Sequence, residues 1–348
     1  MWYDTPMNEP KVTDLDYINF LLAAPRVVSC TEAARVQLDA PNRAAHDALT
    51  RLLHRLEPDT TPLWQEAEPL IDRTRGLLIC DDTTLDKPYA QQIALVHRHW
   101  SGTHRRVVKG INLTTLAWSD GAHAVPCDYR LFDAPNDGVT KNDHVRAMLG
   151  TAKRRRFRPT YVCFDGWYSS LANLKYIRSL AWQWLTRLKA NRLVNPDGQG
   201  NRPLSAGDIR NGGTRVHLKG YGVILVFRID TPDGDTEYWA TSDLDMTMAE
   251  RAATARQIWT IETYHRDIKQ YGGVERCAAR SAHAHRNHIG WGLRAYLRLI
   301  WHELETGTTR FAAKMGIIRP AIQQFLTDPS AILAGFPQAG MAHKRSTA

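Results

Sequence analysis

The spacing of apolar residues predicts helices in the first part of the chain. Apolar positions in 14–24 recur with a helical period, and a short helix is expected to begin after Ser29. A second helix is expected over 42–56, where an apolar stripe is flanked by basic residues. With a turn at 38–41 between them, these two helices have the pattern of a helix-turn-helix unit that reads DNA. The alternative is a helical hairpin that packs only for stability.

Short apolar runs that end in polar residues predict a strand-rich middle. The runs 77–80 and 160–164 have the length of buried strands, and acidic residues follow each of them directly. Two further strand-like runs lie within 104–133, and the sequence Ser-Asp-Gly at 119–121 is typical of the hairpin turn between them. A helical period returns over 143–157. Strands and helices in this order predict a mixed α/β sheet that helices cover.

The later segments extend this α/β pattern. A helix at about 171–180 and a strand at 182–188 precede a β-rich insertion, which is followed by a long helix over 247–270 and by two more helices. The predicted units are a helical DNA-binding domain at 1–70, the first part of the core at 71–188, the insertion with its return strand at 189–243, the core helix and C-terminal helices at 244–330, and a flexible tail at 331–348.

Composition narrows the class of partner. The 348 residues carry a formal net charge of +9, which favours a polyanion such as nucleic acid. The five cysteines are scattered and show no Cys-x2-Cys pair, so we expect reduced thiols without a zinc site or disulfides. No apolar run is long enough to span a bilayer and no secretion signal is visible, so we expect a cytoplasmic protein without a membrane partner.

Three acidic residues stand where they could meet. Asp82 and Asp165 follow buried strands, and Glu262 lies on the long helix near the end of the chain. Clustered carboxylates repel one another, and a pair of Mg²⁺ or Mn²⁺ ions would relieve that repulsion and suit in-line phosphoryl transfer. Each acid also has a plainer explanation: either Asp could be a turn residue, and Glu262 could be a solvated partner of Arg266.

At this point the motifs resemble those of DDE transposases of bacterial insertion sequences, in the group with a Tyr-x2-Arg-x3-Glu-x6-Lys signature. The segment CDDTTLDKPY is similar to the first-acid motif, and VCFDGWYS is similar to the second. The segment that contains Glu262 is similar to the third, with Lys269 at the expected spacing. The positions for the Arg and Tyr of the signature hold Ile258 and Ala255 instead. This departure leaves open a copy that no longer cuts DNA.

The resemblance implies a ribonuclease-H-like core with a β-rich insertion, in which Asp82, Asp165 and Glu262 are the catalytic ligands of two Mg²⁺ (or Mn²⁺) ions. The substrates would be double-stranded DNA, namely the terminal inverted repeats of an insertion sequence and the target DNA. Nicking by water would be followed by strand transfer from a 3′-OH. A homodimer is expected on DNA because two ends must be held together, in a bacterial cytoplasm and on the nucleoid when bound.

A neighbouring residue could take the role of Asp82 as the first catalytic acid. Asp81 precedes Asp82, and adjacent strand residues point to opposite faces, so only one of them can face the site. The resemblance favours Asp82, which is followed directly by two threonines.

Basic residues near these motifs are the expected DNA contacts. Arg266 and Lys269 share a helical face with Glu262 and would hold phosphates next to it. The run 153–158 could bind phosphates or be a solvated helix end, whose dipole also favours cations. The full set expected to contact DNA is Arg266, Lys269, Lys87, Arg43, Arg51, Lys153, Arg154, Arg155 and Arg156.

The histidine-rich segment 283–288 has a spacing that could hold a metal. Because Arg280 and Arg286 lie close by and would repel a cation, we expect DNA contact or helix capping instead. Three classes of function remain at this stage: an active transposase, a transposase-derived DNA-binding protein without catalysis, and a carboxylate-pair enzyme such as a glycosidase. The basic charge and the predicted helix-turn-helix speak against the glycosidase.

Overall fold

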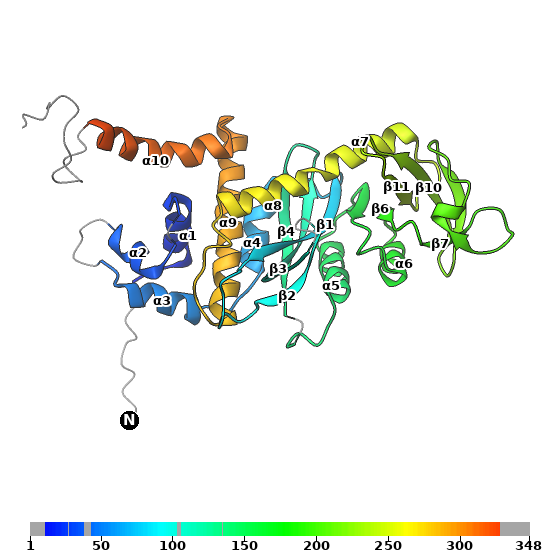
Figure 1. The fold of residues 1–348 in the computed structure, drawn as a ribbon. Helices are drawn as coiled ribbons and strands as arrows, with labels where there is room; N and C mark the ends of the chain where they lie inside the picture. The colour runs from blue at the N-terminus through cyan, green and yellow to red at the C-terminus, as the bar shows by residue number, and fades with distance from the viewer. Residues whose placement is uncertain (1–10, 27, 38–42, 103–105, 134, 328–348) are drawn as a thin grey trace, which may run out of the picture.

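The structure is a computed structural model that describes residues 11–26, 28–37, 43–102, 106–133 and 135–327. The expected tail at 331–348 and the expected turn at 38–41 lie outside these residues. Figure 1 shows an elongated molecule with N-terminal helices at one end, a sheet in the middle and the insertion at the other end.

The N-terminal region is helical, as its apolar spacing predicted. Its elements are α1 (Asp14–Ala23), α2 (Cys30–Arg35), α3 (His46–Arg55), α4 (Thr61–Ala67) and the 3-10 turn η1 (Glu68–Leu70). Ser29 caps α2, since its hydroxyl accepts the backbone N–H of Glu32 at 3.1 Å. The connection from α2 to α3 runs from 36 to 45, which is longer than the three or four residues that a helix-turn-helix uses.

These helices share a hydrophobic core with the C-terminal helix α9 (Ala282–Thr306). Tyr17 of α1 and Leu52 of α3 are fully buried in this core, together with Trp291 of α9. The guanidinium of Arg294 on α9 also binds Asp14. The first helices therefore pack as one body with a segment far along the chain.

A single mixed sheet occupies the middle of the molecule. Its strand order is β2-β3-β1-β5-β6-β11-β10-β9-β7-β8, with β4 paired to β3 beside this path. The central strand β1 is antiparallel to β3 and parallel to β5, and β5 is parallel to β6. The strands are β1 (Leu77–Asp86), β2 (His97–Ser101), β3 (Arg106–Ser119), β4 (Ala124–Phe132), β5 (Tyr161–Phe164), β6 (Trp184–Leu188), β7 (Leu193–Asn195), β8 (Arg202–Pro203), β9 (Thr214–Leu218), β10 (Gly222–Asp230) and β11 (Thr236–Thr241), with a 3-10 turn η2 (Leu204–Ala206) after β8.

The strand predicted at 77–80 is longer than expected. It continues through both acids to Asp86, because β3 pairs with it along its whole length, from Leu77 opposite Ser119 to Asp86 opposite Gly110. The acids are therefore inside β1 rather than behind it. The predicted insertion is β-rich, and its last strand β11 pairs with β6, so it extends the core sheet.

Helices cover both faces of the sheet (Figure 1). On one side lie α5 (Lys141–Arg154) and α6 (Leu171–Ser179), and on the other α7 (Met248–Ile258) and α8 (Thr260–Gln270). The single helix predicted over 247–270 is thus two helices that meet at Trp259. Beyond α9, α10 (Arg310–Thr327) projects away from the body (Figure 1).

The ends of α8 and α9 approach closely. Gly272 and Gly273 follow α8, as predicted for its stop, and Gly273 has a φ of +70°. A Cβ on Gly272 would lie 2.7 Å from the carbonyl oxygen of Gly292 on α9, so only glycine fits there. All five cysteines are free thiols, and no helix in the described part of the chain has the length and apolarity of a membrane span.

Candidate functional site

The candidate site lies where the parallel pairing of β1 and β5 ends. In that pairing Cys80 lies opposite Phe164, so the next residues of the two segments are Asp81 and Asp165. Residues in register on neighbouring parallel strands direct their side chains to the same face. Asp165 directly follows the end of β5, and it lies close enough to Asp81 for its charge to raise the pKa of that carboxyl.

Asp81 is buried among negative charge. Burial, then the charges of Asp165 and Asp82, raises the pKa of Asp81 well above its usual range, and Glu262 adds to this shift. The imidazole Nδ1 of His265 on α8 lies 3.9 Å from a carboxylate oxygen of Asp81. Because burial lowers the pKa of His265 to about 3, this imidazole is neutral and does not balance the carboxylate. No Lys or Arg in the described residues forms an ion pair with Asp81.

Asp165 is held in place by the turn that follows it. One of its carboxylate oxygens accepts the backbone N–H groups of Trp167 at 3.0 Å and Tyr168 at 3.3 Å. Burial, then the charge of Asp82, raises the pKa of Asp165, and these two hydrogen bonds oppose the shift only in part. The orientation of the carboxylate is thus fixed by backbone.

Asp82 has a different environment. As the next residue in β1 it points to the opposite face from Asp81, where the ammonium of Lys141 lies 3.0 Å from its carboxylate. The hydroxyl of Tyr168 donates to Asp82 at 2.7 Å, and the side-chain amide of Asn112 donates as well. Burial acts to raise the pKa of Asp82, but these partners outweigh it and hold the pKa below its usual value. Asp82 is therefore a satisfied ion-pair partner.

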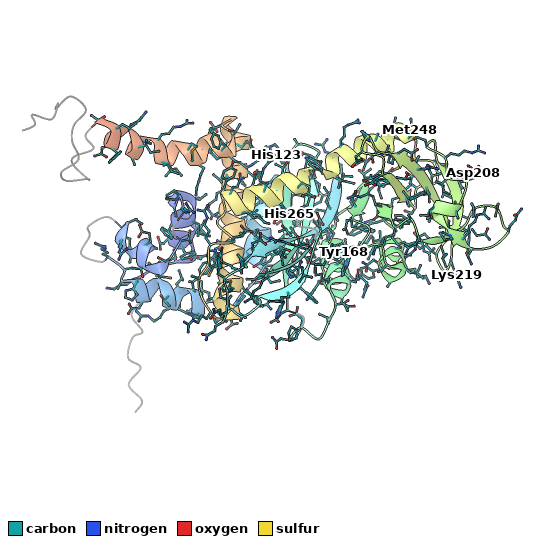
Figure 2. All side chains as sticks on the ribbon, in the orientation of Figure 1. His123, Tyr168, Asp208, Lys219, Met248 and His265 are labelled. Carbon is teal, nitrogen blue, oxygen red and sulfur yellow. The ribbon has the colours of Figure 1, made fainter. Side chains whose placement is uncertain are left out.

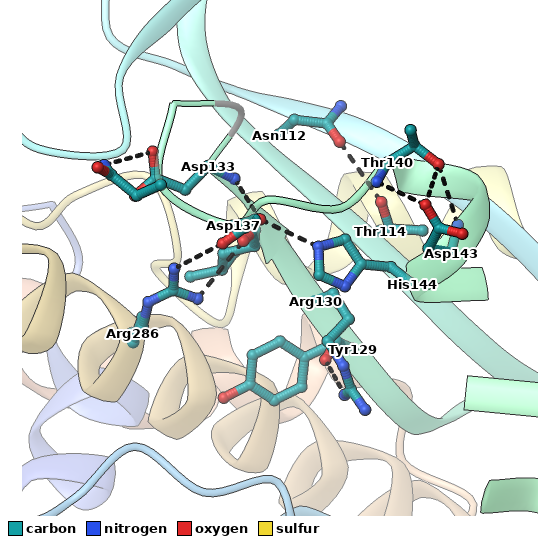
Figure 3. Close-up of polar contacts among 12 residues, drawn as sticks. Asn112, Thr114, Tyr129, Arg130, Asp133, Asp137, Thr140, Asp143, His144 and Arg286 are labelled. Carbon is teal, nitrogen blue, oxygen red and sulfur yellow. Dashed lines mark hydrogen bonds and ion pairs between the residues drawn. The ribbon is translucent and has the colours of Figure 1, made fainter. Parts of the chain in front are cut away.

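Lys141 is the first residue of α5, and Figure 3 shows the polar contacts that hold the start of this helix, among them those of Thr140 and His144. Thr140 caps the helix, and the following turn is tied by His144, whose ring nitrogen lies 3.0 Å from a carboxylate oxygen of Asp137. Arg286 of α9 reaches the same carboxylate at 3.7 Å. The segment that carries Lys141 is thereby linked to both the sheet and the C-terminal helices. No local pattern predicts this ion pair, since Lys141 lies far from Asp82 in the chain.

Glu262 stands in the first turn of α8, on the same side of the sheet as His265. Its side chain is exposed, and its charge contributes to the raised pKa of Asp81. Two hydroxyl contacts fix α8 against β3, from Tyr264 to Thr115 at 3.2 Å and from Thr260 to Ser119 at 3.0 Å. Within the described residues no three Asp, Glu, His or Cys side chains are close enough to hold a metal ion. The glutamate would have to turn toward the two aspartates to complete such a site.

Two lysines that were expected to contact DNA phosphates bind oxygen atoms of the protein itself instead. Lys87 is 9% exposed, and its ammonium donates to the backbone carbonyls of Glu275 and, at 2.7 Å, of Cys277. Lys269 donates to the carbonyl of Thr84 at 2.7 Å and pairs with the carboxylate of Glu275 at 3.4 Å. These lysines fasten the segment after α8 to β1, which corrects the expectation that Lys87 is available to DNA.

The other predicted contacts differ in how far they reach solvent. Arg266 on α8 and Arg51 on α3 are exposed, and Arg43 is exposed while donating to the carbonyl of Ala34 at 3.1 Å. The basic run is partly structural, since Arg155 donates to the carbonyl of Cys127 at 2.8 Å and packs on a tryptophan ring. Lys153, Arg154 and Arg156 are exposed at the end of α5. That end lies about 20 Å along the helix from Lys141.

The histidines of the segment 283–288 serve packing. His283 lies 2.7 Å from the carbonyl of Leu56, and His288 is fully buried between the hydroxyl of Tyr17 at 3.0 Å and the carbonyl of Gly273 at 2.9 Å. His285 is fully buried with no hydrogen-bond partner for either nitrogen. These positions join α9 to the N-terminal helices, so His285 and His288 are not DNA contacts.

A mixed sheet with paired acids inside it and a third acid on a covering helix defines a candidate phosphoryl-transfer core. The family model of the DDE superfamily endonucleases matches residues 15–260, and the chain therefore belongs to that family. The matched region contains both aspartates of the pair and ends just before Glu262. No curated protein matches the sequence.

Among solved structures, the fold is similar to that in the cryo-EM structure of a piggyBac transposase synaptic complex with hairpin DNA. That similarity has a TM-score of 0.51 at 10% identity and covers 98% of this chain and 79% of the other. Two further matches are weaker. The Drosophila P element transposase strand transfer complex has a TM-score of 0.28 at 8% identity, covering 91% of this chain and 86% of the other. The Mos1 strand transfer complex has a TM-score of 0.20 at 10% identity, covering 53% and 60%. Of these likenesses only the piggyBac one bears on the fold, which is similar to that of the piggyBac transposase.

Proposed function

We propose that the protein is a transposase that cuts and joins DNA at the terminal inverted repeats of a bacterial insertion sequence. Membership of the DDE superfamily endonucleases and a transposase-like fold support this proposal. The net charge of +9 fits a nucleic-acid substrate. Two DNA ends must be held together for strand transfer, so we infer that the protein acts as a homodimer on DNA.

The reaction site is assigned to Asp81, Asp165 and Glu262. The observation that supports this assignment is the register of β1 with β5, in which Cys80 lies opposite Phe164, so that Asp81 and Asp165 are the next residues of the two segments. Asp81 faces α8, as its contact with His265 shows, and Glu262 lies one turn before that histidine. Asp82, which the sequence motif favoured, turns to Lys141 instead. We therefore place Asp81 in the role first expected for Asp82.

The donors in this site fit hard divalent cations such as Mg²⁺ or Mn²⁺. All three proposed ligands are carboxylates, which these ions prefer. Asp81 and Asp165 both have raised pKa values, although the charge of Arg187 acts against the shift of Asp165, and neither acid forms an ion pair with a Lys or Arg in the described residues, so a bound cation would relieve their repulsion. When bound, a pair of such ions would activate the attacking oxygen and stabilise the leaving oxygen in phosphoryl transfer.

The chain's own groups would position the acids and the DNA. The backbone N–H groups of Trp167 and Tyr168 hold the Asp165 carboxylate in one orientation. The buried ring of His265 supports Asp81 from the side of α8. Arg266, exposed next to His265, is placed to contact a phosphate close to the site.

Cleavage of DNA with inverted-repeat ends, measured with Mg²⁺ or Mn²⁺, tests the proposal. Wild-type protein should nick the ends, and Asp81→Asn, Asp165→Asn and Glu262→Gln should each remove detectable nicking while leaving DNA binding in place. Asp82→Asn should keep cleavage, reduced by about 10- to 100-fold as for groups that orient ligands. Activity that survives Asp81→Asn but not Asp82→Asn would reverse the assignment.

A second candidate function is a transposase-derived DNA-binding protein without catalysis. Ile258 and Ala255 stand where the family signature has Arg and Tyr, which favours this alternative. Wild-type protein that binds the ends but never nicks them, with either metal, would establish it in place of the transposase.

A further inference from the structure

His265 of α8 is buried beside the acid site, and its hydrogen-bonding capacity is largely unused. The side chain is 5% exposed, and its Nε2 has no hydrogen-bond partner among the described residues. Its Nδ1 lies 3.9 Å from a carboxylate oxygen of Asp81, which is beyond the ~3.2 Å limit of an N–H···O hydrogen bond. Figure 2 shows His265 where α8 passes over the core sheet. A polar ring thus lies next to an acid that has no Lys or Arg partner in the described residues.

The surroundings of His265 differ from those of the other fully buried histidines. His288 has a partner for each of its ring nitrogens. His285 is unpartnered, but burial lowers its pKa to about 4 without a contribution from any carboxylate. His265 combines an unpartnered nitrogen with a neighbouring carboxylate. Because a buried polar group without a partner costs about 1–3 kcal/mol, a ligand that binds the ring would remove a penalty as well as add a contact.

The spacing along α8 places a second acid on the same face of this helix. Glu262 precedes His265 by three residues, and residues three apart are neighbours on a helix surface. The same Glu-x-x-His spacing directs both side chains to the metal pair in helical bundles that hold two iron or manganese ions. Contacts from Thr260 and Tyr264 to β3 fix α8 on the sheet. The helix therefore carries a carboxylate and an imidazole next to the strand that contains Asp81.

The distance between Asp81 and His265 suits two ligands of one cation. Carboxylate oxygens and imidazole nitrogens lie about 2.0–2.2 Å from a bound divalent ion, so two such atoms on one ion can be up to ~4.3 Å apart. The 3.9 Å between the Asp81 oxygen and the His265 Nδ1 lies within this limit, although it is too long for a hydrogen bond. Since the imidazole is neutral, one of its nitrogens has a lone pair that can bind a metal.

We propose that His265 is a nitrogen ligand of the divalent cation bound by Asp81, and that it makes the site favour transition-metal ions over Mg²⁺. This inference rests on the acid site proposed above. Mg²⁺ prefers carboxylate and water oxygens, whereas imidazole nitrogen suits the divalent ions of the first transition row. Asp81, Asp165 and Glu262 alone would form an oxygen-only site. With His265 the donor set contains one nitrogen, which shifts the preference towards ions such as Co²⁺.

Metal binding in the absence of DNA tests this role separately from cleavage. The full chain is titrated with CoCl₂ and with MgCl₂ in a calorimeter, and the visible absorption spectrum of bound Co²⁺ reports its donor atoms. His265→Phe keeps a ring but removes both nitrogens. It should alter the Co²⁺ spectrum and weaken Co²⁺ binding at least ~10-fold, which is the smaller loss typical of groups that only support a ligand. Mg²⁺ binding should stay nearly unchanged, because water can replace the imidazole on that ion.

His285→Phe is the matched control, because it replaces another buried and unpartnered histidine and should leave both affinities unchanged. If His265→Phe binds Co²⁺ as the wild type does, or loses affinity for Co²⁺ and Mg²⁺ by the same factor, the ring is not a ligand. Circular dichroism checks that each variant is folded. If His265→Phe is unfolded, His265→Asn provides the same comparison, since its amide oxygen suits Mg²⁺ better than Co²⁺.

Asp81→Asn separates this inference from the proposed function. This variant should weaken the binding of both ions. Unchanged binding of both would overturn the acid site and the histidine ligand together, whereas a failure confined to His265→Phe would overturn only the histidine ligand. Absence of DNA cleavage in the wild type would overturn the proposed reaction and leave these titrations unaffected.

Discussion

The ammonium of Lys141 lies 3.0 Å from the carboxylate of Asp82, whereas the neighbouring Asp81 lies 3.9 Å from the neutral ring of His265 and pairs with no Lys or Arg among the described residues. Of these two adjacent acids in β1, Asp82 has its charge neutralised by a lysine, and Asp81 does not. The difference arises because the pleat sends them to opposite faces of the sheet. The proposed cation site therefore uses Asp81, the acid without a neutralising partner.

Substitutions of Arg266 and Lys269 on α8 should have different effects, the first on DNA binding and the second on protein stability. Arg266 is exposed, so Arg266→Ala should weaken binding to duplex DNA and reduce the salt slope by about one phosphate contact. Lys269 is tied to Thr84 and Glu275, so Lys269→Ala should mainly lower the stability of the protein. Fluorescence anisotropy across salt concentrations, with urea unfolding of both variants, provides the measurement. A larger change of salt slope for Lys269→Ala than for Arg266→Ala would contradict this division.

The close approach of α8 and α9 should not tolerate a methyl group. In Gly272→Ala the new Cβ would meet the carbonyl of Gly292 at 2.7 Å, and relief of that overlap should cost about 1–3 kcal/mol of the free energy of unfolding. Because α8 would shift, cleavage should fall as well. Gly316→Ala is the control, since nothing lies within 4 Å of its Cβ and alanine favours a helix by up to about 1 kcal/mol. Urea unfolding of the two variants compares them, and equal stability would disprove the steric contact.

Acid should weaken the interface around His288. Burial lowers its pKa to about 3 in the folded protein, against 6.5 for the free side chain. Between these values the unfolded chain binds the extra proton, so stability falls as the pH drops from about 6.5 toward 3. His288→Gln should reduce that dependence by up to about 1.4 kcal/mol per pH unit. His46→Gln alters a side chain that is 66% exposed and should leave the slope nearly unchanged. Unfolding free energies at several pH values test this, and identical slopes for wild type and His288→Gln would refute it.

Arg294 should hold the N-terminal helices to the body. It is 7% exposed, binds Asp14, and donates to Glu66 at 2.9 and 2.7 Å. Arg294→Met should cost toward the lower end of the ~3–5 kcal/mol lost when a buried pair is broken, because both carboxylates are partly exposed. The control Arg51→Met breaks an exposed pair and should cost no more than about 1 kcal/mol. Limited proteolysis should cut α1 faster in Arg294→Met than in the wild type. An unchanged rate of proteolysis at α1 would contradict the anchoring role.

Local signals in the sequence were enough to predict many elements of the fold. The hairpin at 119–121 has a strand on each side, and Gly272-Gly273 follow the end of α8 as predicted. Such features depend on a few adjacent residues, so they can be read without knowing the fold. The predicted β-rich insertion also formed, since alternating apolar residues specify strands wherever they pair.

Features set by distant partners could not be predicted. The length of β1 depends on pairing with β3, and the choice between Asp81 and Asp82 depends on the register with β5 and on Lys141. The burial of Lys87 likewise depends on carbonyls far along the chain. A break at Trp259 has no proline or glycine to signal it. For the strand length, the choice of acid and the burial of Lys87, the deciding contact is long-range, so the local sequence could not reveal it.

The division at Trp259 has a mechanical consequence. Arg251 of α7 lies over the ring of Trp239 in the insertion, at 5.8 Å, while Tyr264 anchors α8 to β3. The run of helix is interrupted just ahead of Glu262, so α7 is fastened to the insertion and α8 to the core sheet, each by its own contacts. A tilt of the insertion would therefore load the joint at Trp259 before it reached the glutamate.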